Sequence, residues 1–224
     1  MSDRTGIEWT DATWNPVRGC TRVSEGCRHC YAERIAARFS GPGMPYEGFA
    51  VGAPLGDPHW TGKVSLVPER LEDPIRWGKP RRIFVNSMSD LFHERLEDRD
   101  VARVFAVMAS HEARRHTFQI LTKRPERMRD FVRRIRRCEG GWLTHNGHEP
   151  ASYGGDGVII PGDEWPLPNV WLGVSAEHQA AADERIPQLL ETPAAVRFVS
   201  AEPLLGTIRF DRIWTFKGFQ LTSL

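Results

Sequence analysis

Short apolar segments alternate with amphipathic ones along most of the chain. Four apolar segments of four or five residues, at 82–85, 117–121, 170–174 and 196–199, each run directly into polar residues. A weaker fifth candidate lies at 13–17. Continuous apolar runs of this length are typical of strands that are covered on both faces of a sheet. The pattern therefore predicts five short, buried strands.

Helical periodicity separates these predicted strands. Apolar residues recur at i, i+3, i+4 and i+7 over 101–108 and again over 128–135, and a third helix is expected over 177–190 with a kink at Pro187. Alternation of strand and helix predicts an α/β fold built from βαβ units around a parallel sheet. In such sheets the active site gathers polar residues that follow the carboxyl ends of the strands.

One domain is expected over residues 1–210. The chain has 224 residues, of which 40% are hydrophobic, which is enough for one large core. Two Gly- and Pro-rich segments, 40–62 and 139–168, are predicted to be long surface loops or lids. Residues 211–224 form an atypical C-terminal tail.

Charge and hydropathy narrow the possible locations. The formal net charge of +1 gives no overall field that would draw the protein to nucleic acid or to a membrane. No apolar run approaches 18 residues, and the N-terminal segment lacks the basic and apolar regions of a signal peptide. We therefore expect a cytoplasmic protein without a membrane partner.

Three of the four cysteines lie close together. Cys20, Cys27 and Cys30 fall within eleven residues, whereas Cys138 stands alone. This clustering favours a metal or cluster site over ordinary buried cysteines or a disulfide scaffold. A structural zinc would need a fourth ligand, such as His29 or Cys138. An iron–sulfur cluster on three cysteines would keep one iron open, so both interpretations stay open.

Longer motifs resemble known proteins. The spacing Cys20-x6-Cys27-x2-Cys30-Tyr31-Ala32 resembles a widened radical S-adenosylmethionine signature, which is usually CxxxCxxC. Several blocks also resemble the phage and prophage gene-product 37/68 family of uncharacterised three-cysteine-motif proteins. These blocks are Gly6–Asp11, Trp14–Pro16, Arg82–His93, Leu121–Pro125, Asn169–Ser175 and Arg197–Gly206.

The resemblance implies a fold and two cofactors. The fold would be a partial (β/α) TIM-like barrel of the radical S-adenosylmethionine type, truncated at its C-terminus. Cys20, Cys27 and Cys30 would hold a four-iron–four-sulfur (4Fe-4S) cluster, and S-adenosylmethionine would bind its fourth iron. Reductive cleavage of the cofactor would start radical chemistry on an unknown substrate. The phage relationship places the protein in the cytoplasm of a bacterial host cell.

The strand ends supply the remaining candidate residues. Cofactor binding is assigned to four polar residues: Asn86, Ser87, Asp90 and Ser175. Lys123, Glu177 and Glu202 are the catalytic candidates. The two glutamates end the same Ser-Ala-Glu tripeptide on neighbouring predicted strands, so they would either share a proton or bind loop backbone.

A basic segment follows the third predicted strand. Residues 123–137 carry eight basic and two acidic side chains, and a helix there would present the arginines opposite its apolar stripe. The default interpretation is a solvated face. The alternative is nucleic-acid binding through Arg127, Arg133, Arg134 and Arg137. Three interpretations of the function remain open. The protein is an enzyme, a zinc-stabilised protein that binds nucleic acid or a host protein without catalysis, or an inactive truncated relative.

Overall fold

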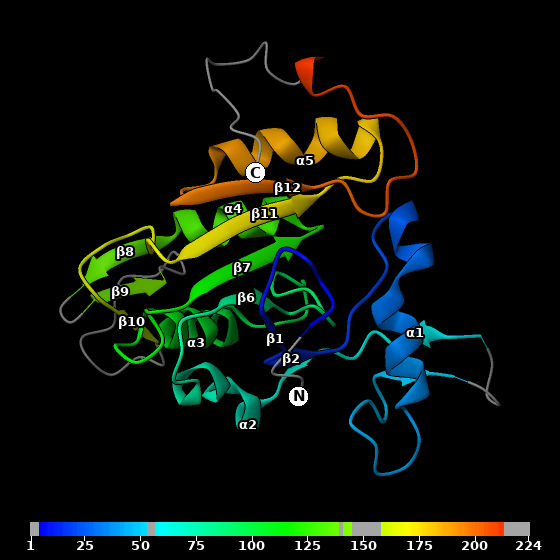
Figure 1. The fold of residues 1–224 in the computed structure, drawn as a ribbon, viewed down its shortest axis with the longest axis horizontal. Helices are drawn as coiled ribbons and strands as arrows, with labels where there is room; N and C mark the ends of the chain where they lie inside the picture. Colours follow the sequence, from blue (N-terminus) through cyan, green and yellow to red (C-terminus); the bar gives the residue numbers. More distant parts are fainter. Residues whose placement is uncertain (1–4, 53–56, 139–140, 145–157, 213–224) are drawn as a thin grey trace.

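Five parallel strands form the central sheet, in the order β1-β6-β7-β11-β12 (Figure 1). The computed structural model describes residues 5–52, 57–138, 141–144 and 158–212. The strands of the sheet are β1 (Ala12–Trp14), β6 (Arg82–Val85), β7 (Thr117–Thr122), β11 (Val170–Ser175) and β12 (Val196–Ser200). All five expected strands are confirmed; β6 has the expected bounds, and the bounds of the other four differ by one to three residues.

Three helices connect consecutive strands of this sheet. They are α3 (Asp98–Ala109), α4 (Pro125–Arg133) and α5 (Gln179–Glu191). Alternate strand residues such as Ile83, Phe118 and Leu172 join residues of all three helices in one buried core. Helix α5 runs through Pro187 as a single element, so the proline does not divide it.

The segment after α4 differs from the expectation. The apolar spacing predicted a helix that continued through Ile135, but α4 ends at Arg133. Residues Ile135–Cys138 form β8, which pairs with β9 (Gly141–Thr144), and β9 pairs with β10 (Ile159–Pro161). Ile135 stays buried in either geometry, so its hydrophobicity did not distinguish them. The expected loop at 139–168 therefore contains sheet, and residues 145–157 lie outside the described part.

Small elements surround the cysteine segment. They are β2 (Val17–Arg18), the 3-10 helix η1 (Glu25–His29), α1 (Tyr31–Arg38), β3 (Ala50–Val51), β4 (His59–Trp60), β5 (Ser65–Leu66), α2 (Pro68–Leu71) and η2 (Asp73–Arg76). Strands β3 and β4 pair with each other and pack against α1. The expected loop at 40–62 is thus partly a hairpin. A last 3-10 helix, η3, covers Phe210–Arg212, and the rest of the predicted tail lies outside the described residues.

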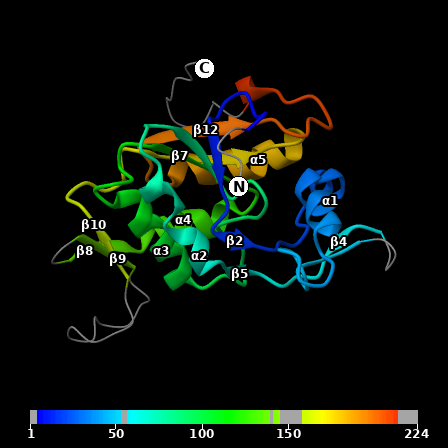
Figure 2. The same cartoon turned by 60° about the horizontal axis from the view of Figure 1, so that its bottom comes forward.

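The strand order matches the order along the chain, as it does in a (β/α) barrel. The described strands nevertheless form an open sheet with β1 and β12 at its two edges, so a closed barrel is not formed among them. On the face opposite the helices, the Trp9 ring lies 4.7 Å from Phe84 and 6.3 Å from Phe198. Helix α1 lies beyond the carboxyl ends of the strands in both views (Figures 1 and 2). Among the described helices, none is long and apolar enough to cross a membrane.

Candidate functional site

A cavity of about 600 Å³ lies between the carboxyl ends of the sheet and the cysteine segment. Small-molecule sites are typically about 300–1,000 Å³. Of the ten residues assigned from the sequence to metal, cofactor or catalysis, nine line this cavity. They are Cys20, Cys27, Cys30, Asn86, Ser87, Asp90, Lys123, Ser175 and Glu202. The exception is Glu177.

The three cysteines occupy one loop that wraps the mouth of the cavity. Cys20 follows β2, Cys27 lies in η1, and Cys30 is the residue that caps the start of α1. All three are free thiols and partly buried. Gly19 before them has a φ of +86°, and a Cβ atom there would lie 1.8 Å from the Lys63 carbonyl oxygen. This close approach requires glycine and fixes the path of the loop into Cys20.

The thiols surround the cavity rather than one point within it. Among the described residues, no three His, Cys, Asp or Glu side chains are gathered so that they could hold a single metal ion. A four-iron cluster has a different requirement, because each cysteine binds a different iron and the sulfurs lie farther apart. Such a cluster would use the three cysteines that line this cavity, whereas a structural zinc would need a fourth ligand at one centre.

Burial keeps two of these thiols protonated in the absence of a metal. Burial is the main cause that raises the pKa of Cys20 to about 12, and the negative charge of the nearby Asp90 is the second. Burial also raises the pKa of Cys30, although backbone N–H groups of Glu33 and Ala32 oppose this change. Binding of a metal or cluster would release these protons, since the thiolate is the ligand.

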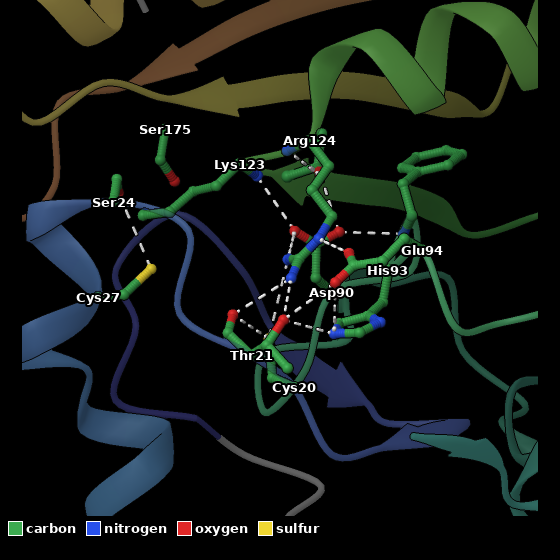
Figure 3. Close-up of polar contacts among 12 residues, drawn as sticks. Cys20, Thr21, Ser24, Cys27, Asp90, His93, Glu94, Lys123, Arg124 and Ser175 are labelled. Atoms are coloured by element: carbon green, nitrogen blue, oxygen red, sulfur yellow. Dashed lines mark hydrogen bonds and ion pairs between the residues drawn. The ribbon is translucent and has the colours of Figure 1, made fainter. Parts of the chain in front are cut away.

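Arg124 forms the centre of a polar network beside Cys20 (Figure 3). Its guanidinium pairs with Asp90 at 3.1 Å and with Glu94 at 2.6 Å. It also donates to the Thr21 hydroxyl at 2.8 Å and approaches the Cys20 sulfur at 3.9 Å. Burial alone would lower the pKa of Arg124, but the charge of Asp90 and the hydrogen bond and charge of Glu94 raise it. The arginine therefore stays charged and ties the cysteine loop to the ends of β6 and β7.

His93 joins this network through the Thr21 hydroxyl. Its Nδ1 accepts the backbone N–H of Arg95, so the neutral ring carries its proton on Nε2 and donates to Thr21 at 2.8 Å. Burial and the positive charge of Arg124 lower the pKa of His93 to about 4. His93 is therefore a neutral hydrogen-bond donor to Thr21. Glu94 has a pKa of about 2 because hydrogen bonds to its own backbone and to Arg124 outweigh its burial.

The turn after β6 presents an unusual asparagine to the cavity. Asn86 has a φ of +58°, and among the residues that the structure describes no other non-glycine residue has a positive φ. Its Oδ1 accepts the Val17 N–H, whereas its buried Nδ2 has no hydrogen-bond partner among the described residues. Asparagine tolerates the left-handed region better than most residues, and strained positions of this kind cluster at binding sites. Asn86 therefore offers a free donor to a ligand.

Glu177, a catalytic candidate from the sequence, is not among the residues that line the cavity. Its carboxylate is fully buried, pairs with Arg185 at 2.9 Å, and accepts a hydrogen bond from Ser24. Burial opposes ionisation, but the Ser24 and Arg185 contacts lower the pKa of Glu177 overall. A Cβ atom on Gly26 would lie 3.1 Å from this carboxyl group. Glu177 thus supports the cysteine loop, while Glu202 is exposed at the cavity.

The arginines after β7 are ion-paired with acidic residues. Arg127 and Arg134 pair with Asp98, Arg133 pairs with Glu191, and Arg137 pairs with Asp163. Contact with nucleic acid at this surface stays a prediction, and it would have to compete with these pairs.

Sequence reasoning missed the central role of Arg124 and the aromatic rings of Trp9 and Phe84 that line the cavity. The position of Arg124 next to Lys123, just past β7, was the available signal.

Neither curated proteins nor solved structures yield a match to this chain. One family profile matches residues 4–217, which is nearly the whole chain. The chain therefore belongs to the family described as Protein of unknown function (DUF5131).

Proposed function

We propose that this protein binds a 4Fe-4S cluster on Cys20, Cys27 and Cys30 and S-adenosylmethionine beside it, for radical chemistry on a substrate in the same cavity. The observation that carries the proposal is the arrangement of three free thiols around one cavity at the carboxyl ends of a parallel sheet. When bound, the cluster and cofactor would supply a one-electron reduction and hydrogen abstraction from the substrate.

The cavity offers complementary groups for the cofactor. The unpartnered Asn86 amide is suited to a carboxylate, and the Glu202 carboxylate is suited to an ammonium group. The Trp9 and Phe84 rings supply an apolar wall on the sheet side. These residue types match the amino-acid and heteroaromatic parts of S-adenosylmethionine. Ser87, Asp90 and Ser175 supply further polar groups at the same strand ends.

The remaining protein groups would orient and shield rather than react. Arg124 and Glu177 hold the two sides of the cysteine loop. The Asp90 carboxylate is occupied by Arg124, the Thr122 hydroxyl and the Lys123 N–H. Lys123 also lines the cavity, and we assign its ammonium group to the substrate.

The proposal extends to ancestry and architecture. The radical S-adenosylmethionine relationship and a phage or prophage origin rest on the sequence motifs. A partial (β/α) barrel is supported by the strand order, which follows the chain order.

Metal content tests the cluster. Protein purified anaerobically should carry about four irons and matching sulfide per chain with a broad visible absorbance, as expected for this ligand type. Cys27→Ala should lose both, whereas Cys138→Ala, the matched control on β8, should retain them. One zinc per chain without iron would overturn the proposal and support a zinc-stabilised binding protein instead.

Cofactor binding is tested at Asn86. Asn86→Asp preserves the side-chain shape and the acceptor for Val17 but replaces the free donor with a negative charge. We expect the affinity of the iron-loaded protein for S-adenosylmethionine, measured by calorimetry, to fall at least about tenfold. Unchanged affinity would remove Asn86 from the cofactor site.

A further inference from the structure

The exposed face of α1 carries arginines without acidic partners. Arg34 and Arg38 lie one helical turn apart, and Arg28 precedes them in η1. Within the part of the chain that the structure describes, none of these three guanidinium groups has an ion pair or side-chain hydrogen bond, unlike the paired arginines of α4. The acidic residue of α1, Glu33, is buried and bound by Arg22 at 2.7 Å, so it does not offset them. Glu25 is the exposed carboxylate of the same loop.

Large apolar side chains alternate with these arginines. Tyr31, Ile35 and Phe39 follow one another at four-residue spacing and are 46%, 36% and 49% exposed. The opposite face of α1 is buried through Ala32, Ala36 and their neighbours. Helical spacing therefore places rings and guanidinium groups together on one solvent-facing surface.

This surface continues into the cavity. Tyr31 lines the cavity and is also exposed on α1, and its hydroxyl donates to the Ser87 carbonyl at 2.6 Å. A polymer that lies along α1 would thus pass the cavity mouth. Both views place α1 beyond the ends of the strands (Figures 1 and 2).

We propose that the exposed face of α1, formed by Arg28, Tyr31, Arg34, Ile35, Arg38 and Phe39, binds a single-stranded nucleic acid and directs one of its nucleotides into the cavity. Unpaired guanidinium groups suit the phosphates, and exposed rings suit stacking with bases. An acidic protein would use the charges but would gain less from the rings. This inference rests on the proposed function, because it names the class of substrate that would enter the proposed cavity. It places the nucleic-acid-binding surface on α1 and not on α4.

The test compares two arginine pairs with the same spacing. A labelled single-stranded oligonucleotide of about 12 nucleotides is titrated with the full chain, purified anaerobically, over a series of salt concentrations. Arg34→Gln/Arg38→Gln removes two charges from α1, and Arg129→Gln/Arg133→Gln removes two from α4. We expect the α1 variant to bind about tenfold more weakly and its salt slope to fall by about 1.4, at about 0.7 for each phosphate that the protein no longer neutralises. The α4 variant should change affinity less than about twofold.

Two further variants guard against misfolding of the double variant. Arg28→Gln lies outside the helix, and Phe39→Ala removes a ring at its end; each should weaken oligonucleotide binding several-fold without changing the unfolding midpoint. Absence of binding by the unmodified protein, equal losses in the α1 and α4 variants, or unaltered binding by all α1 variants would overturn the proposal. Displacement of the oligonucleotide by polyglutamate at equal charge concentration would also overturn it and identify an acidic protein surface as the partner.

Iron content separates this inference from the proposed function. If Arg34→Gln/Arg38→Gln retains its iron and loses the oligonucleotide, the inference is supported independently of catalysis. If the unmodified protein binds the oligonucleotide through α1 but contains no iron, the proposed function fails and the α1 surface stands.

Discussion

The cysteine loop is held on two sides by buried arginine–carboxylate pairs that differ in their surroundings. Arg185 and Glu177 are 3% and 0% exposed, and they hold the loop at Ser24 and Gly26. Arg124 and Asp90 are each 9% exposed and hold it at Thr21, with the more exposed Glu94 as a third partner. The first pair has no third ion-pair partner among the described residues, whereas the second also includes Glu94.

This difference shows how one short motif can have two roles. Ser-Ala-Glu ends both β11 and β12, and Ser175 and Ser200 are aligned in the sheet. The glutamate after β11 meets Arg185 of the following helix and becomes structural. The glutamate after β12 has no ion-pair partner among the described residues and is exposed at the cavity. The surroundings, and not the motif, determine which carboxylate is available to a ligand.

Removing the isolated carboxylate should have the largest effect on stability. Glu177→Ala leaves the Arg185 guanidinium buried without its counter-charge, so we expect the free energy of unfolding to fall by about 3–5 kcal/mol in urea denaturation. Glu202→Ala is the matched control at the equivalent strand end and should change it by less than about 0.5 kcal/mol. Similar losses in both variants would abolish the distinction between the two glutamates.

Breaking the networked pair should cost less. Arg124→Met leaves Asp90 with the Thr122 hydroxyl at 2.7 Å and the Phe92 N–H at 3.0 Å. We expect a loss of about 2–3 kcal/mol in the free energy of unfolding, together with reduced iron retention. Arg129→Met, in a more exposed ion pair, should lose less than about 1 kcal/mol. A larger loss for Arg124→Met than for Glu177→Ala would reverse the order of the two anchors.

A single methyl group at Gly26 should probe the contact with Glu177. The added Cβ would lie 3.1 Å from a carboxyl carbon that Arg185 holds in place. Overpacking of this kind should lower the free energy of unfolding by about 1–2 kcal/mol and displace the loop between Cys20 and Cys27. Calorimetry and iron analysis of Gly26→Ala measure both effects, and an unchanged protein would show that the loop is not seated on Glu177.

The smallest effect should be a pH dependence of the free energy of unfolding that comes from His93, which donates a hydrogen bond to Thr21. The folded pKa of His93, about 4, lies below its ordinary value of 6.5, so the unfolded chain binds more protons between these values. His93 therefore contributes stability that is present above the unfolded pKa and is lost as the pH falls. Between about pH 6.5 and about pH 5.5 the loss should be about 1 kcal/mol. His93→Gln should lack this part of the pH dependence; a variant that retained it would assign it to another group.

Local sequence was sufficient for the sheet and for most of the cavity. Apolar runs ending in polar residues identified four of the strands and a weaker pattern identified β1, and parallel strands necessarily bring Asn86, Lys123 and Ser175 to one edge of the sheet. The end of α4 was not predictable in this way, because Ile135 satisfies both a helical stripe and a buried strand position. Pairing of β8 with β9 decided between them.

The ion pairs of the arginines after β7 could not be predicted for a related reason. Their partners, Asp98, Asp163 and Glu191, are tens of residues away in the sequence and become neighbours only in the fold. The three unpaired arginines near α1 give no comparable signal in the sequence because they do not form a dense run. Charge density along the chain thus gave less information than pairing in space.

The anchors of the cysteine loop also impose an order on biosynthesis. The three cysteines are complete at residue 30, but the last residue that fixes their loop is Arg185, about 155 residues later. At 5–20 residues per second this interval is roughly 8–30 s on the ribosome. During that time the nascent chain carries three thiols without their final supports, so the cysteine loop reaches its folded geometry only after α5 has been translated.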